Sequence, residues 1–378
     1  MTIFGFLSTY PPTRCGLATF TAALASALPA HGDPDSRVTR VDDLIPTGPA
    51  SPGARTSVVG DLHPGDPHSR TAAALALSGC DVAIVQHEYG IYGGRDGDEI
   101  LDVLAQITSL RIVVLHTVRE APSVHQRWLL DRVAGLASAI VVMTEAARDT
   151  LARQYSVPMS KVHVIPHGVA AWRSRTSPRS AARDRPMVLT WGLLGPGKGI
   201  EWGIRALAER PGFPAPPRYV VAGQTHPKIV SESGEAYRES LASLARELGV
   251  ESQIEFDGRY RDEYELASLV AEADVVLLAY DSREQSTSGV LVEAIAAGKP
   301  VIATRFPHAV ELLSGGAGIL VAHESPRAIA DALRRILDRR DSALKVALPA
   351  PSLPSNSWET VAAQYRSLAA ALAASAAA

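Results

Sequence analysis

The sequence predicts an α/β protein with two domains, each built on a parallel β-sheet. Short apolar runs alternate with Ala- and Leu-rich stretches of helical length, which is the pattern of parallel strands joined by crossover helices. This alternation occurs once in each half of the 378 residues. Of all residues, 46% are hydrophobic, which is enough to bury two cores.

The first half opens with an apolar run at residues 2–8 and a helical stretch at 17–28. Each later apolar run ends at a polar residue or a glycine, as parallel strands do where they enter loops, and strands are expected at 81–88, 111–118, 139–145 and 161–168. The segment from Pro29 to Arg70 is rich in Pro, Gly and Asp. We expect it to be irregular, although 37–41 and 56–60 are candidate short strands.

The second half restarts the same pattern, with strands expected at 186–192, 218–224, 253–259, 274–280, 300–306 and 317–322. The segment from Ala170 to Pro186 is rich in Arg, Ser and Pro, lacks an apolar period, and is expected to link the domains. A second polar break, Ala347 to Ser357, precedes a last helix that begins at Trp358 and could pack on either domain. The expected domains are therefore residues 1–172 and 185–346.

The composition excludes several classes of protein. The 37 basic and 40 acidic residues nearly balance and form no basic block, so nucleic acid is not an expected partner. Cys15 and Cys80 lie far apart without metal-ligand spacing, which favours free thiols in a reducing cytoplasm. The N-terminus lacks the basic region of a signal peptide, and no apolar run is long enough to span a membrane. A cytoplasmic location is expected, and a peripheral membrane contact stays open.

The turn and helix after the expected strand 274–280 are suited to bind a phosphate. Ligands of parallel sheets bind beyond the carboxyl ends of strands, where helix N-termini offer N–H groups. Ser288 is a plausible N-cap, and Gly289 allows a ligand to approach the backbone. Glu293 lies about 7 Å further along the helix, the distance from a diphosphate to a ribose, so it could bind ribose hydroxyls. Alternatively, Glu293 is a solvated helix charge and the Ser/Thr run is a flexible loop.

Two more glycine turns follow expected strands. In "TWGLLGPGKGIEWGI" (190–204), Lys198 would meet a phosphate beside the helix start. The stretch from Gly192 fits the first seven positions of a P-loop, but Gly199 replaces the hydroxyl residue that binds Mg²⁺, and the dinucleotide fingerprint fails because Ile200 occupies its third small position. In "PPTRCGLATF" (11–20), Gly16 could let the first half approach the same anion.

Three histidines, His87, His116 and His167, close expected strands of the first half. Each alone would be a hydrogen-bonded structural residue, but three at one sheet edge favour at least one substrate contact. They have no metal-ligand spacing. Asp96 and Asp98 form a D-x-D pattern in a loop after two glycines, where solvated side chains are expected more than a metal site.

This combination resembles the family 4 retaining glycosyltransferases. The resemblance is carried by the order and spacing of "PPTRCGLATFTAAL", "VIPHGV", "GLLGPGKG", "SGVLVEAIAAGKPVIAT" and the Trp-led last helix. It implies the GT-B fold, in which two Rossmann-like domains face each other across a cleft and the C-terminal helix, here about 357–378, crosses back to complete the N-terminal domain. The first domain would then bind the acceptor and the second the donor.

The resemblance also implies a reaction and a set of site residues. A hexose would pass from a GDP- or UDP-sugar to a carbohydrate, lipid-linked or small-molecule acceptor, with retained configuration, front-face assistance by the diphosphate, no metal and no permanently bound cofactor. His116 would lie near the transferred sugar, with Glu284 and Gln285 as further catalytic contacts. The donor-binding residues implied are Gly16, Gly192, Lys198, Ser288, Gly289, Val290, Leu291 and Glu293.

Two positions depart from the family pattern. Leu193 stands where the family often has an arginine, so Lys198 must carry more of the charge opposite the diphosphate. Gln285 stands where the family has a glutamate eight residues before the ribose glutamate, and Glu284 lies beside it. We expect Gln285 or its backbone to replace that glutamate, Glu284 to be an auxiliary contact, and the protein to be active. The alternatives are a binding or regulatory subunit of the same fold without turnover, and a sugar-nucleotide epimerase.

Overall fold

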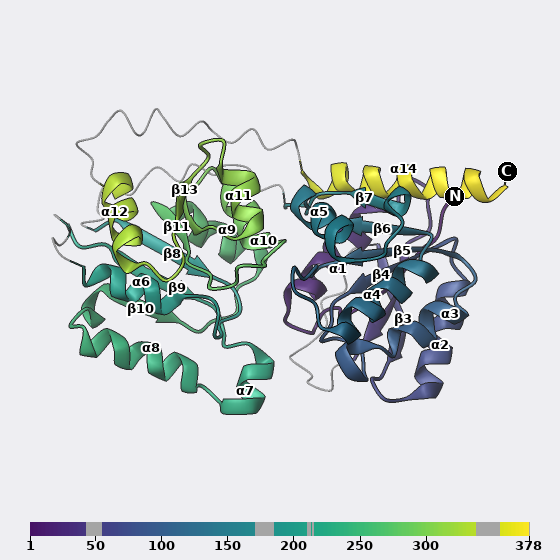
Figure 1. Cartoon of the computed structure of the whole chain (residues 1–378), viewed down its shortest axis with the longest axis horizontal. Helices are drawn as coiled ribbons and strands as arrows, with labels where there is room; N and C mark the ends of the chain where they lie inside the picture. Colours follow the sequence, from purple (N-terminus) through teal and green to yellow (C-terminus); the bar gives the residue numbers. More distant parts are fainter. Residues whose placement is uncertain (43–54, 171–184, 210–212, 214, 338–355, 378) are drawn as a thin grey trace. The chain divides into compact units, whose positions relative to one another are not determined.

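The computed structural model describes residues 1–42, 55–170, 185–209, 213, 215–337 and 356–377. The chain forms two compact units, Met1–Ala170 with Ser355–Ala378, and Ala171–Pro354. Most of the expected linker from Ala170 to Pro186 and of the polar break from Ala347 to Ser357 lies outside the described residues. Each unit is an α/β structure in its own right (Figure 1).

The first unit is built on a seven-stranded parallel sheet with the order β3-β2-β1-β4-β5-β6-β7. β1 and β4 are buried along their whole length, as strands covered by helices on both faces must be. The strand order reverses between β1 and β4, which is where ligands of such sheets bind. The strands are β1 (Phe4–Ser8), β2 (Ser36–Val41), β3 (Thr56–Leu62), β4 (Val82–His87), β5 (Leu110–Leu115), β6 (Ala139–Val142) and β7 (Val162–Val164).

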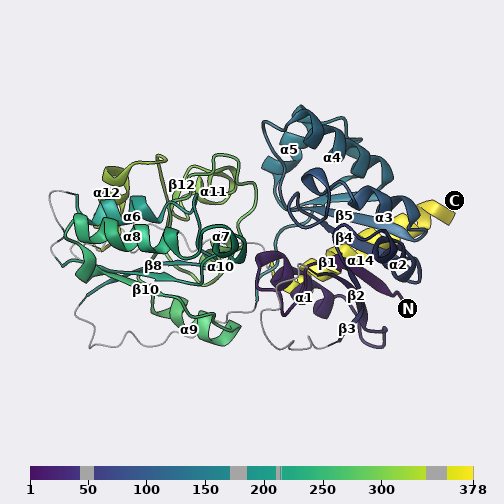
Figure 2. The same cartoon turned by 90° about the horizontal axis from the view of Figure 1, so that it is seen from below.

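Helices cover both faces of this sheet, and each face has its own apolar core. One core joins the sheet to α2 (Pro67–Ser78), α3 (Ile100–Gln106), α4 (Val124–Leu136) and α5 (Glu145–Gln154). The other joins it to α1 (Gly16–Ala27) and to the C-terminal α14 (Trp358–Ala377). α14 packs beside α1 (Figure 2). Its Tyr365 is fully buried in this second core. The last helix therefore packs on the first unit.

The second unit contains a six-stranded parallel sheet with the order β10-β9-β8-β11-β12-β13. Its order reverses between β8 and β11, so the turns after these two strands flank the expected ligand position. The strands are β8 (Met187–Trp191), β9 (Arg218–Ala222), β10 (Ile254–Asp257), β11 (Val275–Leu278), β12 (Val301–Thr304) and β13 (Ile319–Val321).

Helices again form two cores, one on each face of the second sheet. The first core is made with α6 (Ile200–Leu207), α8 (Ala236–Glu247) and α12 (Pro326–Leu337). The second is made with α9 (Glu263–Glu272), α10 (Gly289–Ala296) and α11 (Pro307–Leu313). A further helix, α7 (Pro227–Ser233), follows β9. Among the helices of the described ranges, none is long and apolar enough to cross a membrane.

These two parallel sheets confirm the predicted α/β fold class, and each expected strand is present. The candidate strands 37–41 and 56–60 are confirmed, so the segment from Pro29 to Arg70 is less irregular than expected. It contributes β2, which pairs in parallel with β1, and β3, which pairs with β2. Residues 43–54 between these two strands lie outside the described residues. The two strands are stabilised by this pairing, which the composition of the segment does not reveal.

Candidate active site

The glycine turn after β8 packs tightly against the end of β11. Gly199 precedes α6 with a positive φ of 63°, and a Cβ atom at this position would lie 1.7 Å from the carbonyl oxygen of Ala279. Only glycine fits such a close approach. The serine or threonine hydroxyl that a P-loop requires therefore has no room here.

Lys198 extends from this turn over the aromatic ring of Tyr280. Its Nζ atom lies 4.7 Å from the ring centroid, at cation–π distance, and the Tyr280 ring stacks on Phe306 with 5.1 Å between centroids. Within the described ranges, no carboxylate lies within ion-pair distance of the Lys198 ammonium. The aromatic ring holds the charge in place, and no acidic side chain of the described residues neutralises it.

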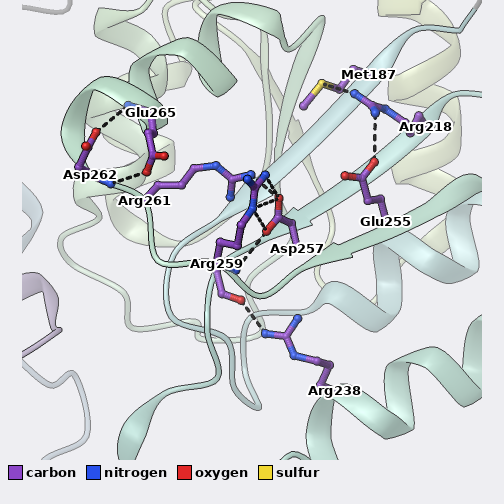
Figure 3. Close-up of polar contacts among 10 residues, drawn as sticks. Met187, Arg218, Arg238, Glu255, Asp257, Arg259, Arg261, Asp262 and Glu265 are labelled. Carbon is purple, nitrogen blue, oxygen red and sulfur yellow. Dashed lines mark hydrogen bonds and ion pairs between the residues drawn. The ribbon is translucent and has the colours of Figure 1, made fainter. Parts of the chain in front are cut away.

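The arginines near the ends of β9 and β10 already have protein partners (Figure 3). Arg259 lies 2.8 Å from the Asp257 carboxylate, and Arg261 pairs with the same group. Hydrogen bonds from Arg259, with further help from Arg261, hold the pKa of Asp257 well below its ordinary value. Arg238 donates to the carbonyl oxygen of Gly223 at 2.6 Å and pairs with Glu235 at 3.3 Å. These guanidinium groups stabilise the turns, and Leu193 adds no cation of its own.

The N-terminus of α10 offers open backbone donors. The Ser288 hydroxyl accepts the N–H of Leu291 at 3.3 Å, as an N-cap does. The N–H groups of Gly289 and Val290 make no hydrogen bond to any residue that the structure describes. First-turn N–H groups of this kind bind anions.

Glu293 lies one turn into α10 and is joined to the end of β8. The indole N–H of Trp191 donates to Glu293 Oε2 at 3.4 Å. Burial raises the pKa of Glu293 to about 7, against an ordinary 4.5, and the bond from Trp191 only partly offsets this. A Cβ atom added to Gly192 would lie 3.8 Å from Val290. The turn after β8 and helix α10 therefore meet directly.

In the turn before α10, the side chain of Gln285 bonds to the backbone of the turn itself. Gln285 donates from Nε2 to the carbonyl oxygen of Thr287 at 2.5 Å. Glu284 is partly buried. Nothing in these contacts tests the expectation that Gln285 or Glu284 touches the sugar, so that role stays a prediction.

In the first unit, His116 follows β5 and faces the core that contains α1. Its Nε2–H donates to Gln86 Oε1 at 2.7 Å, and its ring lies edge-on to Phe20 with centroids 4.9 Å apart. Burial first, and then His167 and His87, lower the pKa of His116 to about 3. The imidazole is therefore neutral at pH 7, with its proton on Nε2 and an acceptor lone pair on Nδ1.

The other two histidines separate onto different faces. His167 packs against Phe20 and against Trp358, with centroids 5.1 and 5.5 Å apart, and its Nδ1–H donates to its neighbour's carbonyl oxygen. His87 is buried and packs against Tyr89 at 5.2 Å. Burial lowers the pKa of each to about 4. His116 and His167 thus share one aromatic cluster, and His87 lies outside it.

Gly16 is the first residue of α1 and is exposed, and a Cβ atom there would meet nothing within 4 Å.

Among the loop residues, Asp96 and Asp98 lie 2.9 and 3.3 Å from the two ring nitrogens of His125, so these carboxylates have a protein partner. No group of acidic, histidine or cysteine side chains suited to a metal occurs within the described residues.

Three further residues contact the candidate site residues and lie in no sequence motif: Trp191, Tyr280 and Gln86. All three are buried strand or strand-end residues. Buried positions of this kind usually serve packing. Only their contacts distinguish them: Trp191 with Glu293, Tyr280 with Lys198, and Gln86 with His116. A polar residue inside an apolar strand, as in "VAIVQHE", was the one available signal.

Residues 185–339, which lie in the second unit, match the family described as Glycosyl transferases group 1. An alpha-D-kanosaminyltransferase of Streptomyces kanamyceticus is 26% identical over 247 residues, which cover 63% of this chain and 61% of the relative. A D-inositol 3-phosphate glycosyltransferase of Corynebacterium urealyticum is 38% identical over 144 residues, which cover 36% of this chain and 33% of the relative. The chain thus spans less than two thirds of the length of either relative.

Solved structures resemble the chain over nearly its whole length. Anabaena Alr3699/HepE in complex with UDP and glucose gives a TM-score of 0.74 at 16% identity, covering 98% of this chain and 100% of that chain. Sucrose-phosphate synthase from Thermosynechococcus elongatus gives 0.73 at 20% identity, covering 99% and 100%. With the two parallel sheets, these likenesses confirm the GT-B fold.

Proposed function

We propose that the chain is a glycosyltransferase that moves a sugar from a nucleoside-diphosphate sugar to an acceptor hydroxyl. The observation that carries this proposal is the convergence of three groups at one sheet edge of the second unit. They are the Lys198 ammonium, the open N–H groups at the start of α10, and the half-buried side chain of Glu293. The match of residues 185–339 to a glycosyltransferase family supports the same class of reaction.

Each group suits one part of the donor. A diphosphate binds the N–H groups of Gly289 and Val290 and the charge of Lys198, because helix N-termini and ammonium groups both stabilise anions. Glu293, one helical turn from the start of α10, accepts hydrogen bonds from the ribose hydroxyls. A UDP-sugar or a GDP-sugar meets these requirements, and the complex of Alr3699/HepE with UDP supports the first. The lysine and the helix supply the positive charge that a metal ion would otherwise bring.

The reaction we propose retains the anomeric configuration of a hexose. The bond between the anomeric carbon and the diphosphate oxygen breaks, and the acceptor oxygen bonds to the same face of that carbon. The departing diphosphate oxygen takes the proton of the acceptor hydroxyl, so no protein nucleophile is needed. Glu284 and Gln285 hold sugar hydroxyls during this step, which an amide can do as well as a carboxylate.

The first unit supplies the acceptor side of the reaction in this proposal. His116 is a neutral imidazole whose orientation is set by Gln86 and Phe20, and its free lone pair suits a sugar hydroxyl. Gly16 leaves space beside the start of α1. A carbohydrate, a glycolipid or a small polyol fits this set of neutral hydrogen-bonding groups.

The proposal is tested by incubating the full chain with UDP-, GDP-, ADP- and dTDP-sugars, with and without polyol acceptors, and measuring the released nucleoside diphosphate. We expect release with one nucleotide class. A protein that only binds would shift in melting temperature without any release. An epimerase would interconvert donors without releasing the diphosphate. A chain that neither binds nor turns over any of these donors would refute the proposal.

A further inference from the structure

We propose that His308 is a positioning residue that shapes the turn before α10 for the anionic part of the donor. The inference rests on the proposed function, because it deepens the account of the same donor site. His308 is the second residue of α11 and is 3% exposed. It lies twenty positions from the turn in sequence, and its role is visible only from its contacts.

His308 binds both ends of the turn that runs from Gln285 to Ser288. Its ring Nδ1 accepts the backbone N–H of Ser288 at 2.8 Å. Its own backbone N–H donates to the carbonyl oxygen of Gln285 at 3.3 Å. A single buried residue on a neighbouring helix therefore closes the turn across its whole length.

The Ser288 contact fixes the tautomer of the ring. A backbone N–H can only donate, so Nδ1 of His308 must carry a lone pair, and the neutral ring has its proton on Nε2. Leucine at this position would have a similar volume but no acceptor. Asparagine could place its amide oxygen near the position of Nδ1 and accept the same N–H.

This contact decides which backbone donors face a ligand. The N–H of Ser288 is occupied by His308, and the N–H of Leu291 is occupied by the Ser288 hydroxyl. Gly289 and Val290 between them are left as the open donors within the described residues. If His308 lost its acceptor, the buried N–H of Ser288 would lack a partner, and the turn would have to move to satisfy it.

Gln285 completes the same arrangement. Its side-chain N–H donates to the carbonyl oxygen of Thr287, and a glutamate carboxylate could not make this bond because it has no proton to donate. The same turn is thus stabilised by its own residue Gln285 and by His308 of the neighbouring helix α11. A glutamine at position 285 therefore suits this closed turn better than a glutamate.

The test compares His308→Leu and His308→Asn with Ile329→Ala in the full chain. Ile329 is fully buried in α12, in the core on the other face of the sheet, and controls for loss of stability alone. Hydrogen exchange of peptides covering 282–292 reports the Ser288 contact without any ligand. Calorimetric titration with UDP, GDP, ADP and dTDP, and with the four nucleosides, reports the donor site.

We expect His308→Leu to speed exchange in 282–292 and to weaken diphosphate binding by about tenfold, with nucleoside binding nearly unchanged. His308→Asn should restore both to within about threefold of the wild type. Normal diphosphate affinity in His308→Leu, or an equal loss in Ile329→Ala, would overturn the inference while the proposed function stands. If the wild type binds no diphosphate, the proposed function fails. In that case, unchanged hydrogen exchange of peptides 282–292 in His308→Leu would still overturn the inference about His308.

Discussion

At the scale of single residues, the half-buried carboxyl of Glu293 opposes folding at neutral and higher pH, when it is ionised. Its folded pKa of about 7 lies above the ordinary 4.5, so the folded chain holds the proton more tightly than the unfolded chain. The resulting stabilisation is complete below about pH 4.5 and is lost as the pH rises to about 7. Above about pH 7, the charged carboxylate lowers the free energy of unfolding by about 3 kcal/mol. Residues retained for function often destabilise the fold in this way.

We predict that Glu293→Gln is more stable than the wild type, by a margin that grows between about pH 5 and pH 7 and then levels at about 3 kcal/mol. Urea unfolding at a series of pH values measures this margin. The same variant should raise the donor KM, because a neutral amide is a weaker acceptor for the ribose hydroxyls. Higher stability with unchanged donor KM would remove Glu293 from the donor site.

Lys198 should act on the diphosphate alone. We predict that Lys198→Ala weakens nucleoside-diphosphate binding by about 1.5–3 kcal/mol, because a charge-assisted hydrogen bond is lost. Nucleoside affinity should barely change. Titration calorimetry with both ligands measures the difference, and Arg205→Ala, which removes an exposed cation from the last turn of α6, is the matched control. An equal loss for the nucleoside would argue that Lys198 supports the fold of the turn.

His116 should affect turnover more than donor binding. We predict that His116→Ala lowers kcat at least about tenfold with little change in donor affinity, since a group at the transferred sugar acts mainly in the transition state. His116→Gln retains a donor near the position of Nε2, so it should keep the contact with Gln86 and the stability of the unit. If His116→Gln turns over normally, the imidazole serves the structure only.

At the scale of elements, the turn between β8 and α6 depends on a close backbone approach. We predict that Gly199→Ser destabilises the chain by at least about 2 kcal/mol, because its Cβ would meet the Ala279 carbonyl and its φ is positive. Gly197→Ser is the matched control, since its φ is also positive but its Cβ would meet nothing within 4 Å. Urea unfolding followed by tryptophan fluorescence compares the two variants. Equal losses would assign the effect to φ alone.

At the scale of the whole molecule, α14 completes the core of the first unit. Tyr365 is fully buried there, and its hydroxyl has no partner among the described residues. We predict that Tyr365→Ala destabilises the first unit by about 3–5 kcal/mol and that Tyr365→Phe is neutral or stabilising. Hydrogen exchange should rise in peptides of residues 1–170 and stay constant in those of 215–337. Faster exchange in both ranges would show that the units unfold together.

The fold could be predicted from the sequence because each central strand is a short apolar run that ends at a polar residue or glycine. β3 could not be predicted with the same force. Its Val58 and Val59 are 49% and 47% exposed, so they do not alternate with a buried face as a covered strand does. β2 is held by pairing with β1, and the edge strand β3 by pairing with β2, and composition does not record these pairings.

The sequence by itself determined the two α/β sheets and the position of Lys198, Ser288 and Glu293 after strands, because strand ends are local features that a linear pattern carries. Only the tertiary structure decided what these residues contact. In each contact the two partners come from different elements of the fold. The contacts are those of Trp191 with Glu293, Tyr280 with Lys198, and His308 with Ser288. Aromatic and histidine residues at strand and helix ends cannot be told from ordinary core residues by residue type alone. Their roles arise from neighbours that packing, and not sequence order, brings within a few ångströms.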